Sequence, residues 1–334
     1  MSSRIRAVLV GCGSIGSGVG RLALQRPDLE LVGAVDTDAA KIGRDLGKVL
    51  GLDRNTGIIV SESLDAVLSK ANADVAFHHV GGPVQAIAPQ LIRLAKLGVN
   101  VVSSNEALAY PFRKHPELSA QIDDAARAGG VTILSTGANP GFVMDTWPLV
   151  MTAVCQLVRR VRVARVQDAG ARRLEFQKKI GAGLTPEEFQ ASAEAGKIRH
   201  SGMAESIAMV AAGLGWELDD IIERVEPVIA KERVQGQHLT VERGQTAGLR
   251  HVGRGITDGD EVIIMEFQAS LGAGESYDAV YLTGTPDMEV VVKGGIHGDV
   301  GTSAMVVNSA LRVLDGPPGL LTMKDIPLVT CRDR

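Results

Sequence analysis

The first residues with a spacing suited to chemistry are Gly11-Cys12-Gly13-Ser14-Ile15-Gly16, which follow a short apolar run and precede an apolar pattern of helical spacing. A second apolar run ends at Asp36, twenty residues after the last of these glycines. Such glycines permit a tight turn, close approach of backbone N–H groups to a pyrophosphate, and close packing of a helix on a strand. The positive end of that helix favours phosphate. We therefore expect a dinucleotide-binding loop.

Asp36 also bears on which dinucleotide binds. Its carboxylate could accept hydrogen bonds from the adenosine ribose and would repel a 2′-phosphate, which favours NAD over NADP. Lys41 and Arg44 lie just beyond and could either accommodate the 2′-phosphate of NADP or form only a solvated helix face. The sequence leaves both cofactors open, with NAD favoured.

Glu106 is the leading candidate for a catalytic group. It follows a strand pattern and the polar pair Ser104-Asn105, at the edge where parallel strands open onto a ligand crevice. A carboxylate there could face the nicotinamide carbon that gives or takes a hydride. The structural alternative is an acid in the first turn of a short helix, where it would stabilise the helix end.

Further candidates lie in loops expected at the same crevice or in the helix that enters the second domain. Asn139 precedes a proline and is held out of helical conformation, so its amide could point at cofactor or substrate. Phe142, Trp147 and His297 could line a substrate pocket, with core packing or a surface loop as the structural alternatives. The residues expected to contact the cofactor are Gly11, Gly13, Ser14, Ile15, Gly16, Asp36, Val80, Gly81, Gly82, Asn105 and Asn139.

Two adjacent histidines, His78 and His79, do not predict a metal site. Neighbouring side chains on a strand point to opposite faces, and no third ligand stands at a useful spacing. We expect a structural role for both histidines and no bound metal.

The elements that would position these residues alternate between strand and helix patterns up to about residue 141. Such alternation is typical of a doubly wound parallel sheet, the Rossmann arrangement. The proline- and glycine-rich loop 137–141 is the predicted end of this dinucleotide-binding domain. Helices are expected over residues 40–50, 63–69, 84–97 and 116–128.

Residues 142–302 have a different pattern. Residues 142–158 are apolar with helical spacing, and much of 225–294 consists of runs with strand character separated by turns. We expect an α+β domain with a mostly antiparallel sheet, which supplies a substrate pocket wall and a subunit interface. A final helix, capped by Thr302 or Ser303, and the rest of 303–334 should pack back on the first domain.

Composition argues against several classes of protein. A net charge of −4, with 22% charged residues, implies neither a nucleic-acid nor a membrane partner. Three cysteines without paired spacing indicate free thiols in a reducing cytoplasm. The uncharged stretch between Asp145 and Arg159 is too short to span a bilayer, and the first strand begins too early for a signal peptide. We expect a cytoplasmic protein that acts on small molecules.

Five stretches together resemble the 2,4-diaminopentanoate dehydrogenase family and the native amine dehydrogenases that share its fold, which are related in architecture to dihydrodipicolinate reductase. The resemblance implies a Rossmann domain followed by an α+β domain, and a glutamate at the position of Glu106 as the catalytic group. It implies NAD(P)-dependent deamination of an amine to a ketone and ammonia, with reductive amination as the reverse. We also expect a homodimer. The stretches are Gly11–Gly16, Ser104–Glu106, Gly137–Asp145, Lys179–Gly183 with Thr185–Phe189, and Gly294–Asn308 with Pro318–Leu320.

The implied reaction needs a base, because hydride leaves carbon only when the amine nitrogen has a lone pair to donate. Two alternatives stay open: an imine or C=C reductase like dihydrodipicolinate reductase, and a sensor that binds NAD(P) without turnover. The His-His pair of that reductase family lies in its second domain before a lysine, whereas His78-His79 lies in the first domain here. The sequence does not settle whether the substrate carries a carboxylate.

Overall fold

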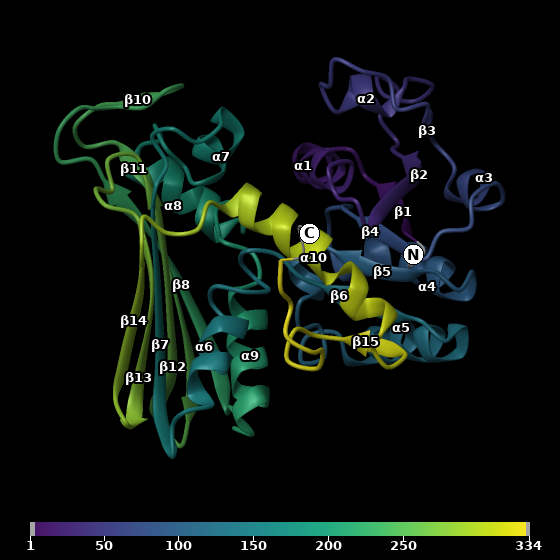
Figure 1. The fold of residues 1–334 in the computed structure, drawn as a ribbon. Coiled ribbons are helices and arrows are strands. Elements are labelled where there is room, and N and C mark those ends of the chain that lie inside the picture. Colours follow the sequence, from purple (N-terminus) through teal and green to yellow (C-terminus); the bar gives the residue numbers. More distant parts are fainter. Residues whose placement is uncertain (1–3, 332–334) are drawn as a thin grey trace. The chain divides into compact units, whose positions relative to one another are not determined.

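The computed structural model describes residues 4–331 (Figure 1). Residues 1–3 and 332–334, at the outer ends of the predicted first domain and its return segment, lie outside the described residues. The chain forms two compact units. The first contains the residues up to Phe142 and those from His297 onward, and the second is Val143–Ile296.

A seven-stranded sheet forms the centre of the first unit, with the strand order β15-β6-β5-β4-β1-β2-β3. Its pairings are parallel, which confirms the predicted doubly wound fold class. Strands β1, β4 and β5 are short apolar runs, as expected where helices cover both faces of a parallel sheet. The strands are β1 (Ile5–Val10), β2 (Leu29–Val35), β3 (Val60–Ser61), β4 (Val75–His78), β5 (Asn100–Ser103), β6 (Thr132–Ser135) and β15 (Gly319–Leu321).

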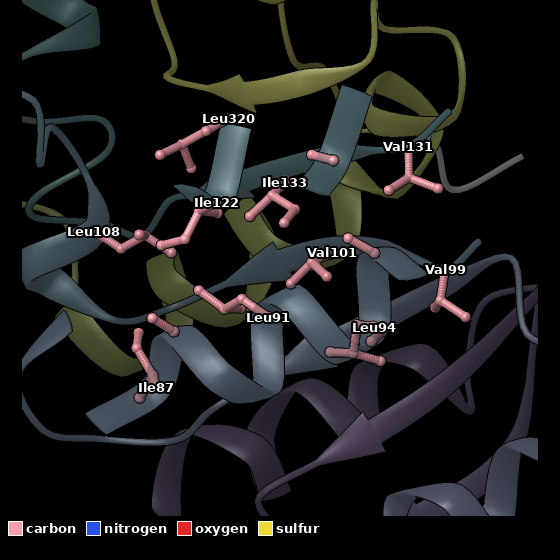
Figure 2. Packing of buried hydrophobic residues seen from close by; sticks show 14 of the residues in the cluster. Ile87, Leu91, Leu94, Val99, Val101, Leu108, Ile122, Val131, Ile133 and Leu320 are labelled. Atoms are coloured by element: carbon pink, nitrogen blue, oxygen red, sulfur yellow. The ribbon is translucent and has the colours of Figure 1, made fainter. Parts of the chain in front are cut away.

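The helices that connect the parallel strands cover both faces of this sheet. Helix α4 packs against α5, and α1 packs against α10. Figure 2 shows Ile87 and Leu91 of α4 and Ile122 of α5 beside Val101 and Ile133 of the sheet. This core fixes the strands whose carboxyl ends carry the candidate site. The helices are α1 (Ser14–Ala23), α2 (Leu46–Val49), α3 (Leu64–Leu68), α4 (Val84–Lys96), the 3₁₀ turn η1 (Glu106–Leu108), α5 (Pro116–Gly129) and α10 (Gly298–Leu314).

A six-stranded sheet, ordered β14-β13-β7-β12-β11-β8, forms the centre of the second unit. The pairing of β7 with β12 is parallel, and the other four pairings are antiparallel, which confirms the predicted mostly antiparallel sheet. A separate two-stranded ribbon joins β9 (Val234–Gln235) and β10 (Thr240–Val241). The sheet strands are β7 (Leu157–Asp168), β8 (Asp220–Ile229), β11 (Thr246–Thr257), β12 (Asp260–Ser270), β13 (Tyr277–Thr285) and β14 (Met288–Lys293).

Helices of the second unit lie on one side of its sheet in Figure 1. Helix α9 packs closely on β11, because Met203 and Ile207 occupy the space that a side chain at Gly253 would need. None of the helices within residues 4–331 is long and apolar enough to cross a membrane. The helices are α6 (Thr146–Thr152), α7 (Leu174–Lys179), α8 (Pro186–Glu194) and α9 (Met203–Leu214).

The helix predicted over residues 40–50 is wrong in most of its length, because only α2, Leu46–Val49, is helical. Gly43 has a φ of 78°, a left-handed conformation that interrupts a right-handed helix. Asp45 then caps α2, with its side chain accepting a hydrogen bond from the N–H of Gly47. The apolar spacing of residues 40–50 did not show that Gly43 and Asp45 would interrupt the helix.

Two further helix predictions are corrected. Residues 142–158 contain only the seven-residue α6, which begins after Asp145 and gives way to β7 at Leu157. Helix α10 begins at Gly298 rather than after Thr302 or Ser303, with His297 at its N-cap position. Thr302 and Ser303 therefore lie inside the helix, where the Ser303 hydroxyl donates to a carbonyl of the preceding turn.

Candidate dinucleotide and active site

The glycine loop of the first unit is a tight turn that closes against its neighbours. Gly11 has a φ of 89°, and a Cβ there would lie 2.7 Å from the carbonyl oxygen of His79. A Cβ at Gly16 would lie 1.9 Å from the carbonyl oxygen of Gly11. Both positions therefore require glycine for the loop to close against its neighbours.

Helix α1 begins in this loop with free backbone donors. Gly13 is its N-cap and supplies no side-chain cap, so the N–H groups of Ser14, Ile15 and Gly16 have no acceptor within residues 4–331. A Cβ at Gly13 would meet nothing within 4 Å, so there is open space beside these donors. Free N–H groups, the positive helix end and open space together fit a dinucleotide pyrophosphate.

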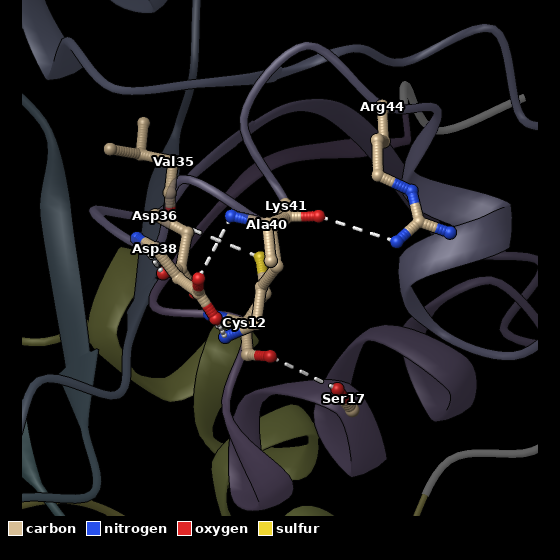
Figure 3. Close-up of polar contacts among 8 residues, drawn as sticks. All are labelled: Cys12, Ser17, Val35, Asp36, Asp38, Ala40, Lys41 and Arg44. Atoms are coloured by element: carbon tan, nitrogen blue, oxygen red, sulfur yellow. Dashed lines mark hydrogen bonds and ion pairs between the residues drawn. The ribbon is translucent and has the colours of Figure 1, made fainter.

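Asp36 lies at the end of β2 and reaches the same loop (Figure 3). Its Oδ2 accepts from the N–H of Cys12 at 2.7 Å and from Lys41 Nζ at 3.1 Å, and its Oδ1 accepts from the N–H of Asp38 at 2.8 Å. Partial burial acts to raise the pKa of Asp36, but these hydrogen bonds outweigh it and leave the pKa below its usual value. The carboxylate is thus ionised and helps to shape the loop.

Lys41 offsets part of the negative charge that a cofactor would meet at Asp36. Its Nζ also lies 3.4 Å from Asp38 Oδ2, and its side chain is 26% exposed. Arg44 donates to the carbonyl of Ala40 at 3.3 Å, one turn away (Figure 3).

Burial, reinforced by the Asp36 charge, raises the pKa of the Cys12 thiol to about 11, so this thiol is uncharged at neutral pH.

The two histidines at the end of β4 are buried and bonded to the neighbouring strand end. His78 joins Ser103 Oγ through Nδ1 and Gln90 Oε1 through Nε2, both at 3.0 Å, and His79 Nδ1 lies 2.8 Å from Ser104 Oγ. Burial lowers the pKa of His78 to about 4 and that of His79 to about 3. Within residues 4–331, no three His, Cys, Asp or Glu side chains gather as a metal site would need.

Asn105 connects two loops that the sequence assigned to the site. Its Nδ2 donates to the carbonyls of Val80, at 3.1 Å, and Gly82, at 2.9 Å. Its Oδ1 accepts from the N–H of Ala107, which caps η1. The hydroxyl of Ser135, on β6, donates to the carbonyl of Asn105 at 2.7 Å. Both amide hydrogens of Asn105 are therefore used inside the protein.

Glu106 is the first residue of η1, directly after this anchored asparagine. Its side chain is half-buried and makes no hydrogen bond or ion pair with another residue in the described part of the chain. A carboxylate on a fixed turn, without a protein partner, is free to handle protons of a ligand.

The loop 137–141 is held from the far end of the chain. The N–H of Ala138 donates to Thr302 Oγ1, on α10, at 3.1 Å. The peptide bond between Asn139 and Pro140 is cis. Of the predicted pocket residues, Phe142 and His297 belong to the first unit, whereas Trp147 lies half-buried in α6 of the second.

Comparison with known proteins decides the family. A family model described as "2,4-diaminopentanoate dehydrogenase C-terminal domain" matches residues 142–333, more than half of the chain. The chain belongs to the 2,4-diaminopentanoate dehydrogenase family. A model described as "Dihydrodipicolinate reductase, N-terminus" matches residues 5–102. The resemblance found in the sequence is thereby confirmed for both parts of the chain.

Relatives of this diaminopentanoate dehydrogenase family member match along nearly its whole length. The 2,4-diaminopentanoate dehydrogenase of Acetoanaerobium sticklandii is 29% identical over 340 residues, covering 97% of this chain and 94% of that protein. An amine dehydrogenase of Streptomyces virginiae is 25% identical, covering 97% and 96%. The solved amine dehydrogenase of Mycobacterium smegmatis has a TM-score of 0.86 at 26% identity, covering 100% of this chain and 99% of that one.

The second unit of this family member contains a buried ion pair that the sequence analysis did not identify. Arg165 Nη1 lies 2.6 Å from Asp278 Oδ1, and both side chains are almost fully buried. Arg165 also donates to the carbonyl of Ile296, as does Gln167, while Asp278 accepts from the N–H of Ile296. These side chains fix the peptide that precedes His297. The signal available in the sequence was a charged residue, Arg165 or Asp278, at a buried position of a strand with an alternating pattern.

Proposed function

We propose that this chain catalyses the NAD(P)-dependent oxidative deamination of an amine to a ketone and ammonia, and the reverse reductive amination. Membership of the 2,4-diaminopentanoate dehydrogenase family makes it an NAD(P)-dependent oxidoreductase that acts on amine groups. The observation that carries the proposed mechanism is Glu106, a carboxylate on an anchored turn with no partner among the described residues.

In this proposal the first unit holds the dinucleotide. The free N–H groups of α1 would bind the pyrophosphate, Asp36 would face the adenosine ribose, and the loops Val80–Gly82 and 137–141, with Asn139, would flank the other half. The bound nicotinamide supplies the hydride acceptor, or in reverse the hydride donor.

Glu106 would manage the protons of the substrate nitrogen. Its carboxylate takes a proton from the ammonium form of the amine, which leaves a lone pair that assists the loss of hydride from carbon. Once that proton has passed to solvent, the negative charge of Glu106 stabilises the iminium ion that develops as hydride leaves. The same carboxylate can then take a proton from the water that adds to the iminium carbon. Return of this proton to nitrogen, with loss of the hydroxyl proton to solvent, releases ammonia and leaves the ketone.

NAD is the cofactor that we propose as preferred, because Asp36 would repel a 2′-phosphate. Lys41 offsets part of that charge and Arg44 adds a second cation nearby, so NADP should bind more weakly rather than be excluded. Titration of the protein fluorescence with NADH and with NADPH tests this preference. Tighter binding of NADPH would contradict it.

The substrate that we propose is a small primary amine, or a diamino acid such as 2,4-diaminopentanoate. Phe142, Trp147 and His297 are the proposed pocket residues. Two of them are aromatic in a chain whose aromatic content is only 3%, and neither is fully buried. A panel of ketones and keto acids, each offered with NADH and ammonium, separates the two substrate classes.

We also propose a homodimer in the cytoplasm. Gly253 of β11 faces α9, so Arg250, at a position of opposite parity on the same strand, lies on the other face of the sheet, where it contacts Glu226 and Glu266. Arg162 lies over the ring of Tyr281. A second copy of the chain could cover such a face. The three cysteines are free thiols, as in a reducing compartment. Light scattering after size exclusion measures the oligomeric state, and a monomer would overturn the dimer.

Ammonium dependence tests the proposed reaction against its alternatives. With a ketone panel, we expect NADH oxidation only when ammonium is present. Oxidation without ammonium would instead favour an imine or C=C reductase related to dihydrodipicolinate reductase. Tight NADH binding with no turnover would favour an NAD(P) sensor.

A further inference from the structure

We propose that Asn105 is a positioning residue, which holds the turn carrying Glu106 in register with the loop Val80–Gly82. The inference rests on the proposed role of Glu106 as the proton-transfer group. It goes beyond that role, because it assigns the placement of the acid to the neighbouring amide rather than to direct contact of Asn105 with the cofactor.

The hydrogen-bonding capacity of Asn105 supports this role. A side-chain amide has two N–H donors and one oxygen acceptor. Here both donors go to the carbonyls of Val80 and Gly82, and the oxygen accepts from the N–H of Ala107. The side chain is buried, with 5% exposure of the residue. One side chain therefore connects the turn of Glu106 to a loop more than twenty residues earlier in the chain.

The backbone of Asn105 is held as firmly as its side chain. Its N–H donates to Ser103 Oγ at 3.1 Å, and its carbonyl accepts from Ser135 Oγ at 2.7 Å. The loop on the other side is intrinsically looser, because Gly82 has a φ of 112° and lacks a side chain to pack. The contact with Asn105 is what ties this loop to the acid.

Two further hydrogen bonds extend the contact along the same strand ends. His78 bonds Ser103, and His79 bonds Ser104, so the last residue of β4 and the residue after it meet the last residue of β5 and the residue after it. Asn105 forms the third step of this series and Glu106 follows it. Misplacing a reacting group by about 1 Å can lower a rate by about a hundredfold. Loss of the third step should therefore act on the rate through Glu106.

The test uses Asn105→Ser, because serine is a good N-cap and can still accept from the N–H of Ala107. Its side chain is too short to reach both loop carbonyls, so the variant removes the connection while keeping the cap and the charge. The single-turnover rate of amine oxidation is measured in Glu106 and Glu106→Gln backgrounds, with the dissociation constant of NADH and the thermal unfolding midpoint measured beside it. In the Glu106 background we expect the rate to fall about tenfold to a hundredfold.

In the Glu106→Gln background the same change should alter the rate by less than about threefold, because a residue that acts through Glu106 has nothing left to position. NADH binding should weaken less than the rate falls. An equal loss of rate in both backgrounds would overturn the proposal. If Glu106→Gln alone left the rate unchanged, the proposed proton-transfer role of Glu106 would fail instead, and absence of amine oxidation by the parent would overturn the proposed function, so the failures are distinguishable.

Asn100→Ala provides the matched control. Asn100 lies at the opposite end of β5, where its amide donates to the carbonyl of Asp74 at 3.0 Å and accepts from the N–H of Thr132 at 2.8 Å. Its loss should lower the unfolding midpoint without changing the rate at saturating substrate. A rate loss as large as that of Asn105→Ser would contradict a role specific to Asn105.

Discussion

Two glycines of the dinucleotide loop have opposite surroundings. A Cβ at Gly16 would collide with the backbone of Gly11 at 1.9 Å, whereas a Cβ at Gly13 would meet no protein atom within 4 Å. Gly16 therefore serves the packing of the loop, and Gly13 keeps space open beside the free donors of α1. Mutation can separate these two requirements.

We predict that Gly13→Ala weakens NADH binding by about tenfold or more, equivalent to about 1.4 kcal/mol, while the unfolding midpoint stays near that of the parent. Gly13 has a φ of −74°, which alanine adopts readily. Gly16→Ala should lower the unfolding midpoint itself, because backbone must move. Fluorescence titration and calorimetry measure the two effects. Parental NADH affinity in Gly13→Ala would refute the assignment of this space to the cofactor.

At the residue scale, the sequence predicts best where a role depends on local backbone geometry. The tight glycine turn and the position of Asp36 after β2 were predictable because they belong to one strand–helix–strand unit. The partners of Asn105 could not be found in this way, since nothing local shows that its amide meets the carbonyls of Val80 and Gly82. The contact between Ala138 and Thr302 is invisible for the same reason, because the two residues lie far apart in the chain.

At the element scale, regular apolar spacing correctly predicted helix α4. The same spacing predicted a helix wrongly where a glycine or a capping side chain favours a turn. The helix expected over 40–50 was wrong because Gly43 and Asp45 define turns there. Strand β11 contains glycines that weaken its alternating pattern, and Ile207 of α9 fills the space beside Gly253. The sequence alone does not show this packing between elements.

His78 should make the first unit sensitive to acid. The unfolded chain accepts a proton on this histidine near pH 6.5, whereas burial lowers the pKa in the folded protein to about 4. The unfolded state thus binds more protons in this window, so stability falls as the pH falls from about 6.5 towards 4, by up to about 3 kcal/mol. Urea unfolding of the parent and of His78→Gln at several pH values measures this.

We expect His78→Gln to be less stable than the parent at pH 7, because Ser103 and Gln90 lose well-placed partners. Its stability should nevertheless change less between pH 7 and pH 5. Equal pH slopes for the two proteins would show that His78 does not carry the effect.

The buried pair in the second unit leads to a prediction for its sheet. Asp278→Asn would leave the Arg165 charge buried without its counter-ion and should cost about 3–5 kcal/mol of unfolding free energy. The matched control is Asp65→Asn, which breaks the exposed pair with Arg93 and should cost less than about 1 kcal/mol. Urea unfolding compares them. Similar losses in the two variants would contradict the importance assigned to burial.

At the scale of the whole molecule, the parts proposed for redox and proton chemistry lie together in one unit. The glycine loop, Asp36 and Glu106 all precede Phe142, and α10 and β15 return to the same unit from the end of the chain. The second unit carries most of the family match and contains Trp147. The fold class was predictable because parallel and antiparallel strands differ in apolar patterning.

The most direct test of the account is the single-turnover rate of amine oxidation by Glu106→Gln. Glutamine keeps the size of the side chain but cannot take the ammonium proton, so the rate should fall by about a hundredfold to ten-thousandfold. NADH binding and the unfolding midpoint should stay close to those of the parent, because the Glu106 side chain makes no hydrogen bond or ion pair with another residue within 4–331. A variant that oxidises the amine as fast as the parent would contradict the central claim.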